Sequence, residues 1–243
     1  MKKKKLVLIS PLKRTVSFVA YLDILGFTEM LASKGFATKI ARVVKRLQSR
    51  AEFDGKHHPT LRYLAISDTI IITADKGDGF WLIRKICQVQ TALLKAGFAT
   101  RGAVSFGPLL TYEGDIGRNI FGKTYLQAYE AEQRLAFYPR VVVLDDAHEE
   151  IRADHALSSS RNSISTYILT DLDGVRFVNQ FSSDVIGLNA KMSATRRKSK
   201  EHCELLSDHL DIGLSNSTPR GKLKWQWLQN QFHTQLDLLL ESA

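Results

Sequence analysis

Residues 17–28 read Ser-Phe-Val-Ala-Tyr-Leu-Asp-Ile-Leu-Gly-Phe-Thr, and this stretch decides how the rest of the chain is interpreted. The apolar run at 16–22 predicts a buried strand that ends on Asp23, whose charge does not suit a core. Gly26 follows, and a helical pattern begins at Phe27. Because a helix N-terminus presents free N–H groups and a positive dipole end, a carboxylate beside it suits a divalent cation bound to phosphate. A simpler alternative is that Asp23 only caps the helix.

A second carboxylate lies at the tip of a predicted hairpin. Residues 61–66 and 69–73 are short β-rich runs separated only by Ser67 and Asp68, which predicts a tight turn. An Asp at a hairpin tip is common turn chemistry on its own. If the strands are neighbours, however, Asp23 and Asp68 converge, and two convergent carboxylates hold Mg²⁺ or Mn²⁺ against phosphates.

The predicted elements indicate an α+β fold. Their order over residues 16–110 is β-α-β-β-α-β, followed by a helix at 122–137 and a strand at 140–144. The first six elements predict the ferredoxin-like arrangement, an antiparallel sheet with helices on one face and the first strand in the centre. We divide the chain into a basic N-terminal lead at 1–14, a core at 15–145, and a C-terminal α/β elaboration at 146–243 that packs on the core or on a partner.

Four motifs resemble, in order and approximate spacing, those of class III nucleotidyl cyclases. They are Asp-Ile-Leu-Gly-Phe-Thr at 23–28, Ala-Ile-Ser-Asp at 65–68, Arg-Gly-Ala-Val-Ser-Phe-Gly at 101–107 and Ile-Phe-Gly-Lys-Thr at 120–124. The fuller pattern, which extends to Lys-Trp-Gln-Trp-Leu at 224–228, looks specifically like the pyrimidine cyclases of the bacterial Pycsar antiphage system. The resemblance implies the palm-like cyclase core and the conversion of a nucleoside triphosphate to a 3′,5′-cyclic nucleotide and pyrophosphate.

The resemblance also implies roles for individual residues. Asp23 and Asp68 would be the catalytic carboxylates that hold two Mg²⁺ or Mn²⁺ ions, with the Ile24 carbonyl as a further oxygen ligand. Backbone N–H groups around Leu25, Gly26 and Phe27 would bind the β- and γ-phosphates.

The chain departs from the purine cyclases of this class on the helix after residue 122. They carry an Asn and an Arg that position the ribose and the transition-state phosphate, and the equivalent positions here are Leu126 and Glu130. Leu cannot form a hydrogen bond and Glu repels phosphate, so either the stabilisation comes from elsewhere or the site is degenerate. Arg101 and Lys123 are candidate phosphate-binding cations, or else ordinary charges of a strand end and a helix surface.

Base selection would differ as well. Tyr63 lies beside the position of the purine-reading Lys, and Asn119 stands at the position of the adenine-contacting Asp. The bulk of Tyr63 would reduce the pocket to the size of a pyrimidine, unless it is only an aromatic residue on the sheet surface. The Asn119 amide both donates and accepts, so it suits uracil or cytosine. We favour UTP over CTP as the substrate.

Class III sites form between two subunits, so the resemblance implies a homodimer with active sites at the subunit interface. The Pycsar branch implies that cyclic UMP, or cyclic CMP, acts on a separate effector protein during phage infection. Two other functions stay open. One is a purine cyclase or another nucleotidyltransferase on the same core, and the other is a catalytically degenerate nucleotide-sensing dimerisation domain.

Composition narrows the possible partners. The 243-residue chain has a net charge of +9, but its basic clusters at 2–5 and 196–200 lack the interleaved aromatics of a nucleic-acid platform. No apolar run approaches the roughly 20 residues of a membrane span, and the run after Lys5 is too short for a signal peptide. We therefore expect a cytoplasmic protein without nucleic-acid or membrane partners. Cys87 and Cys203 fit no metal or redox motif, so we expect free thiols.

Overall fold

The computed structural model describes residues 12–31, 34–58, 60–114, 117–157, 163–186 and 193–241. In chain order the elements are β1 (Lys13–Ile24), α1 (Phe27–Leu31), α2 (Phe36–His57), β2 (Arg62–Ile66), β3 (Thr69–Asp75), α3 (Gly79–Leu94), β4 (Thr100–Gly114), β5 (Gly117–Phe121), α4 (Lys123–Leu135), β6 (Val141–Val143), α5 (Asp145–Leu157), the 3₁₀ turn η1 (Ile164–Thr166), β7 (Ile168–Thr170), β8 (Arg176–Val178), α6 (Ser183–Ile186), α7 (Ser193–Asn216) and α8 (Pro219–Glu241).

Strand β1 is the centre of the sheet because it pairs with a neighbour on each side. It is antiparallel to β3 and, along its whole length, antiparallel to β4. The sheet order is β2-β3-β1-β4-β6-β8-β7, and β5 pairs with β4. The part β2-β3-β1-β4 is the antiparallel ferredoxin-like order, so the predicted fold class is confirmed. Strand β6 joins β4 in parallel, which makes the complete sheet mixed.

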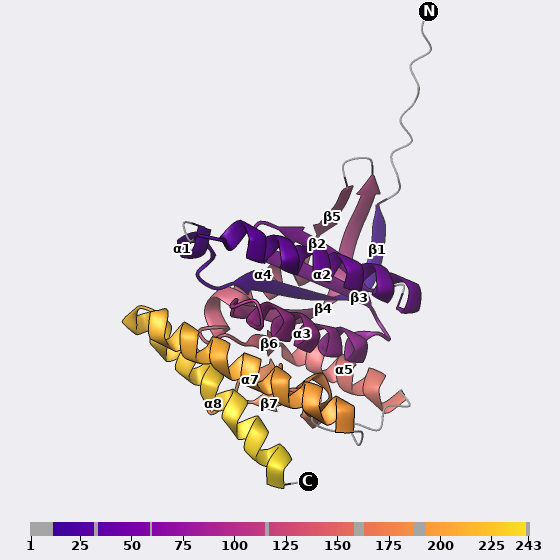
Figure 1. Ribbon diagram of the computed structural model, residues 1–243. Coiled ribbons are helices and arrows are strands. Elements are labelled where there is room, and N and C mark those ends of the chain that lie inside the picture. The colour runs from indigo at the N-terminus through magenta and orange to yellow at the C-terminus, as the bar shows by residue number, and fades with distance from the viewer. Residues whose placement is uncertain are drawn as a thin grey trace, which may run out of the picture.

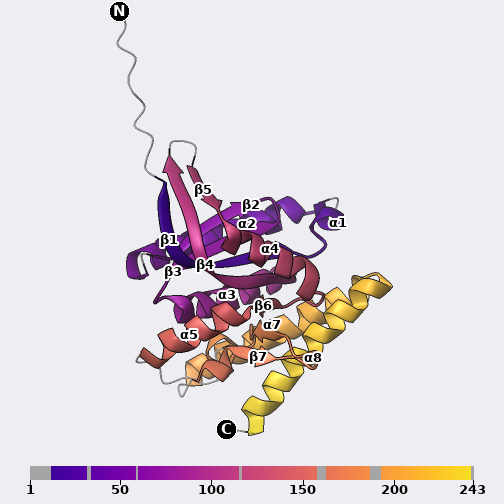
Figure 2. The same ribbon diagram turned by 180° about the vertical axis from the view of Figure 1, so that it is seen from behind.

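Alternating side chains of β1 point to opposite faces of the sheet, and each face has its own core. Phe18 and Leu22 join the main hydrophobic core with residues of α2, α3 and α5. Val19 and Tyr21 pack instead against Ala128 of α4. Figures 1 and 2 show these two layers, with α2 and α3 in front of the sheet in one view and α4 in front in the other. The face covered by α4 is called the α4 face below.

Some predicted boundaries are corrected by the structure. The helical pattern after Phe27 is divided at Gly35, whose φ is +86°, into α1 and α2. Helix α2 then continues to His57, through the turn-prone residues Asp54 and Gly55. A single glycine, Gly55, costs a helix only about 1 kcal/mol relative to alanine and does not end it. The sheet also extends beyond the strand predicted to end near residue 110, because β4 and β5 pair as a hairpin that projects from the molecule in Figure 1.

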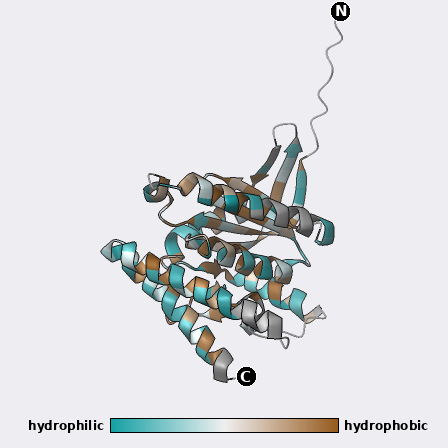
Figure 3. Cartoon of the chain, in the orientation of Figure 1, coloured by the Kyte–Doolittle hydropathy of each residue, from teal (hydrophilic) through white to brown (hydrophobic). Residues whose placement is uncertain are grey.

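The C-terminal part joins the core through the sheet and through two long helices. Strand β8 pairs with β6, and β7 pairs with β8, so this hairpin extends the same sheet. Helices α7 and α8 lie side by side, and Figure 3 shows polar and apolar residues alternating along both. A shared cluster joins them to the end of α3 and the start of β4; its buried members are Leu94, Ala99, Phe181, Leu206, Leu210, Leu228 and Phe232. No helix in the described part of the chain has the length and hydropathy of a membrane span.

The close contact between α7 and α8 requires a glycine. A Cβ atom placed on Gly213 would lie 2.3 Å from the ring of Trp225, closer than any real carbon contact. A glycine inside a helix costs roughly 0.5–1 kcal/mol relative to alanine. The packing of the Trp225 ring directly on the backbone of α7, which only a glycine permits, offsets this loss of stability.

Helix α7 also carries a histidine that is unfavourable to protonate. The Nε2 atom of His202 is buried and has no hydrogen-bond partner among the described residues. Burial, with a smaller contribution from the positive charge of Lys95, lowers its pKa from 6.5 to about 4. Since the unfolded chain titrates near 6.5, the unfolded state binds this proton first as the pH falls.

We therefore expect His202 to lower the free energy of unfolding as the pH falls from about 6.5 towards about 4. Above about pH 6.5 its ring is neutral in both states, so it has no such effect. His202→Gln, which does not titrate, should lose less stability than the wild type between pH 7.5 and pH 5. Urea unfolding midpoints at the two pH values measure the difference. His233→Gln, on the exposed side of α8, is the control and should behave as the wild type. Equal losses in wild type and His202→Gln would contradict the prediction.

Candidate active site

Asp23 and Asp68 come together where β1 meets the β2–β3 hairpin. Asp23 is opposite Thr69 in the sheet, and Thr69 directly follows Asp68. The Ile24 N–H donates to the Asp68 carbonyl at 3.0 Å, and the charge of Asp68 acts on the Asp23 carboxylate. The sequence predicted that these two residues would lie side by side, and the structure places them so.

The turn that carries Asp68 is tight and strained. Ile66 pairs with Thr69, so only Ser67 and Asp68 form the loop, as the sequence predicted. Ser67 has a φ of +57° and is the only described residue other than glycine with a positive value. A side chain in this left-handed region costs roughly 1–2 kcal/mol. The surrounding β2–β3 pairing holds this turn, and with it the position of Asp68.

One arginine lies between two carboxylates on the α4 face. Arg101 of β4 is opposite Asp23 of β1, and its Nε lies 3.3 Å from Asp23 Oδ2. The same nitrogen lies 2.6 Å from Oε1 of Glu132 on α4. The Glu132 side chain is 0% exposed and that of Asp23 is 19% exposed, so neither charge is well solvated. A single guanidinium therefore compensates two partly or fully buried carboxylates.

Burial raises the pKa of both carboxyl groups. Desolvation is the largest effect on the pKa of Asp23, where Arg101 opposes it and Asp68 adds to it. Desolvation also raises the pKa of Glu132, again opposed by Arg101 and reinforced by Asp23. The ammonium of Lys224, from α8, acts on both carboxyl groups. Three carboxylates thus face two cations, so a further positive charge beside Asp23 and Asp68 would be stabilised.

The available donors suit a hard divalent cation. Two carboxylates and the Ile24 carbonyl are oxygen ligands of the kind that Mg²⁺ and Mn²⁺ prefer. Within the described residues, no group of three or more His, Cys, Asp and Glu side chains is arranged to hold a metal ion. Asp23 and Asp68 alone would leave most ligand positions to water and to phosphate oxygens. That is the pattern of ions that bind together with a nucleotide.

The turn after β1 offers fewer N–H groups than the sequence suggested. The Leu25 N–H donates to the Ala99 carbonyl at 2.9 Å and is already used. The N–H groups of Gly26 and Phe27 have no acceptor within the described part of the chain. Gly26 has a φ of +70°, which explains why a glycine stands at this turn. Two of the three predicted phosphate donors thus stay free to bind an anion.

The predicted base-binding residues do not reach this cluster within one chain. Asn119 of β5 is opposite Tyr112 of β4, and Tyr112 is 112 − 101 = 11 residues from Arg101. At about 3.3 Å per residue this is roughly 36 Å along the strand. Tyr63 of β2 packs on the main core beneath α2, which is the face of the sheet opposite α4. Asn119 could therefore act on this cluster only from a second copy of the chain.

Helix α4 separates the two candidate cations. Lys123 is its first residue and is exposed, nine residues before Glu132, which is about 13 Å along the helix axis. Of the two predicted cations the structure brings only Arg101 into the cluster. Leu126 and Glu130 are both exposed on the outer side of α4.

Sequence reasoning missed Glu132 and Lys224. Glu132 follows the buried Ala128 by four residues, so it stands in the apolar stripe of α4. A carboxylate at such a position is a detectable signal, since a buried charge needs a partner. Lys224 gives no local signal, because its position depends on how α8 folds back against the core.

Comparisons with known proteins find only distant likenesses. No protein-family model matches the chain, and no curated protein matches it. Similar solved structures are adenylyl and guanylyl cyclase domains. The catalytic core of a rhodopsin-guanylyl cyclase with converted specificity, in complex with ATPαS, is 14% identical, with 69% of this chain and 98% of that chain covered and a TM-score of 0.48. A bacterial light-regulated adenylyl cyclase is 12% identical, with 81% and 58% covered and a TM-score of 0.49. A dimeric guanylyl cyclase domain of the RhoGC fusion protein from the aquatic fungus Blastocladiella emersonii is 13% identical, with 70% and 96% covered and a TM-score of 0.49. These likenesses are too distant to carry a function, which we infer from the residues of this chain.

Arg101→Gln should lower the free energy of unfolding by about 1–3 kcal/mol, because it leaves the carboxylate of Glu132, on helix α4, buried without its cation. For a chain of this length each kcal/mol corresponds to roughly 2–4 °C in Tm. Glu130→Gln, on the exposed side of the same helix, is the matched control and should change stability by less than about 0.5 kcal/mol. Thermal unfolding followed by circular dichroism measures both, and equal Tm values for the two variants would contradict the prediction.

Proposed function

We propose that this protein is a nucleotide cyclase that converts a pyrimidine nucleoside triphosphate, UTP in preference to CTP, to the 3′,5′-cyclic nucleotide and pyrophosphate. The observation that carries the proposal is the juxtaposition of Asp23 and Asp68 at the end of the central strand, beside the free N–H groups of the following turn. The cyclic product would act in the cytoplasm on a separate effector protein in antiphage defence. That role, like the pyrimidine preference, rests on the sequence motifs.

In this reaction the ribose 3′-oxygen attacks the α-phosphorus, the bond to the bridging oxygen of pyrophosphate breaks, and the hydroxyl proton is released. When bound, two Mg²⁺ or Mn²⁺ ions would supply Lewis acidity at the 3′-hydroxyl and neutralise charge on the triphosphate. Asp23, Asp68 and the Ile24 carbonyl would hold them. The Gly26 and Phe27 N–H groups would bind phosphate oxygens.

Arg101 has a supporting part in this proposal. Its contact with Asp23 competes with a metal ion for the same carboxylate, whereas its shorter contact with Glu132 does not. When the Asp23 carboxylate binds a metal ion instead of Arg101, the contact with Glu132 keeps the guanidinium beside the site. In that position Arg101 adds positive charge near the triphosphate.

A second copy of the chain is part of the proposal. Asn119 of β5 lies opposite Tyr112 of β4, which is too far from Asp23 for Asn119 to act beside it in the same chain. Apolar side chains are exposed on α4, with Leu126 at 52% and Tyr129 at 42% exposure. Exposed apolar groups gathered on one side of a protein mark interaction surfaces.

We infer a homodimer in which Asp23 of one copy and Asn119 of the other complete each site. Because Tyr63 packs beneath α2, it has no part in this arrangement.

A second candidate function is a nucleotide-sensing dimerisation domain without catalysis. It is favoured by Leu126 and Glu130, which stand where purine cyclases carry the Asn and Arg that position ribose and phosphate. Such a domain would bind nucleotide and metal ions and release no pyrophosphate.

Incubation of the purified protein with Mn²⁺ and each of ATP, GTP, CTP and UTP should give cyclic UMP, detected by mass spectrometry. Asp23→Ala and Asp68→Ala should each reduce the product at least about 100-fold, because the metal ions and phosphates lose a ligand. Asp208→Ala, exposed on α7, is the control and should retain activity. A cyclic purine as the main product would contradict the pyrimidine preference, and no product from any triphosphate would favour the sensor.

Leu126→Asp should convert the homodimer to a monomer, because it places a charge in the proposed apolar interface. Light scattering after size-exclusion chromatography gives the mass. Leu172→Asp, at a fully exposed turn position between β7 and β8, should leave the dimer intact.

A stronger check is to mix Asp23→Ala protein with Asn119→Ala protein, each inactive alone. Heterodimers would contain one intact site, so recovered activity supports a shared site and continued inactivity argues against it.

A further inference from the structure

Helix α8 brings a lysine to the Asp23 cluster. The ammonium of Lys224 interacts electrostatically with Asp23, Glu132 and Arg101, which belong to three different core elements. Its Nζ also lies over the Phe137 ring, 5.7 Å from the ring centroid. Helix α8 thus brings a positive charge near the candidate active site.

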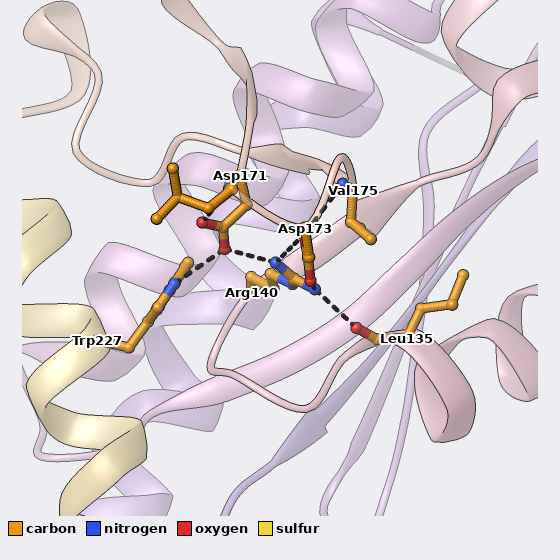
Figure 4. A network of polar contacts seen from close by, with 7 residues as sticks. Leu135, Arg140, Asp171, Asp173, Val175 and Trp227 are labelled. Atoms are coloured by element: carbon orange, nitrogen blue, oxygen red, sulfur yellow. Dashed lines mark hydrogen bonds and ion pairs between the residues drawn. The ribbon is translucent and has the colours of Figure 1, made fainter.

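The position of Lys224 is fixed by its own helix. Trp227, one turn further along α8, donates from Nε1 to Asp171 Oδ2 at 3.0 Å and stacks on Tyr138 at 5.4 Å and 11°. Asp171 is in turn held by the buried Arg140, which also contacts Asp173 (Figure 4). Figure 4 shows these groups joining α8 to the loop before β6 and the turn between β7 and β8. This network, with Trp227 as a positioning residue, keeps the start of α8 against the core.

The same helices contact the turn that follows Asp23. The side chain of Leu25 packs against the cluster formed by α7 and α8, which includes Leu228 one turn after Lys224. The Leu25 N–H is held by the Ala99 carbonyl, so this turn is fixed from two sides. Because Lys224 and Leu228 are one turn apart on α8, this packing brings Lys224 close to the turn that follows Asp23.

The ammonium of Lys224 is near carboxylates, but within the described residues it is not paired with one. In the described part of the chain its ammonium forms no ion pair, whereas Arg101 is engaged by both Asp23 and Glu132. Burial is the largest effect and lowers the pKa of Lys224; Arg101 and Arg220 add to it, whereas Asp23 and Glu132 oppose it. An anion bound beside it would gain a charge-assisted hydrogen bond.

We propose that Lys224 is a phosphate-binding residue of this site, supplied by α8 in the same chain as Asp23 and contacting the triphosphate of the substrate. The inference rests on the proposed cyclase function for the identity of the ligand. It gives the C-terminal helices a direct part in the chemistry, because they deliver a cation where Leu126 and Glu130 offer none. Lys224 would act on the phosphates, and Trp227 would hold it in place through Asp171.

The test measures phosphate binding without turnover. Isothermal titration of the full-length protein with tripolyphosphate in the presence of Mn²⁺ gives a Kd that does not depend on the base or on catalysis. Lys224→Met should raise this Kd about 10- to 100-fold, the usual loss for a hydrogen bond to a charged group. Lys222→Met, which removes an exposed lysine two residues away on α8, should change it less than about twofold. Lys224→Arg should recover most of the affinity, and Tm values of all variants should agree within a few degrees.

The outcomes separate this inference from the proposed function. Cyclic nucleotide formation by the wild type, together with equal Kd values for Lys224→Met and Lys222→Met, would overturn the role of Lys224 and leave the cyclase proposal standing. A raised Kd for Lys224→Met alone, with no cyclic product from the wild type, would support the phosphate contact and reject the cyclase. No binding of tripolyphosphate by the wild type would overturn the inference directly.

Discussion

The contact of Arg101 with both Asp23 and Glu132 is the interaction on which the organisation of this protein depends. It joins β1, β4 and α4, which are far apart in sequence, at one point on the α4 face. A buried carboxylate such as Glu132 is tolerated only while a cation stays beside it, since an uncompensated buried charge is strongly destabilising. The register of β1 with β4 and the packing of α4 must therefore both be correct before the charges are satisfied. The same contact leaves Asp23 only partly neutralised, so a structural requirement and a binding site share one cluster.

Much of the core could be predicted from sequence because its signals are local. The apolar run at 16–22, the two-residue turn at Ser67 and Asp68, and the helical pattern that begins at Phe27 each act over a few residues. Together they indicated the β2-β3-β1-β4 order that the structure contains. The β4–β5 hairpin was missed because its strands are stabilised by pairing with each other, which the polar sequence at 112–119 does not reveal. Tyr63 was placed in a base pocket by analogy, but strand alternation directs it beneath α2.

The residues of the candidate site also differ in how well the sequence alone predicts them. Asp23 and Asp68 were found from motifs, and their proximity followed from the fold. The cations were harder to identify, because Arg101 and Lys123 look alike in sequence and only pairing across β1 distinguishes them. Lys224 is 123 residues beyond Arg101 (224 − 101), so only the tertiary fold brings them together. Charges near a site are set by long-range packing, whereas turn residues are set by local geometry. Sequence reasoning accordingly performed better on carboxylates at strand ends than on their counter-charges.

The continuous sheet has a consequence for how the chain can be divided. Strand β8 pairs with β6, and Ala147 and Ile151 of α5 are part of the main core, so no seam separates the first 145 residues from the rest. A fragment that ended there would leave the far side of β6 without its neighbour and uncover Leu94 and Ala99, which α7 and α8 bury. Open strand edges and bared apolar surface promote association between chains. The first 145 residues and the C-terminal helices are therefore one folding unit, and natural variation in chain length is expected at loops rather than at the boundary between them.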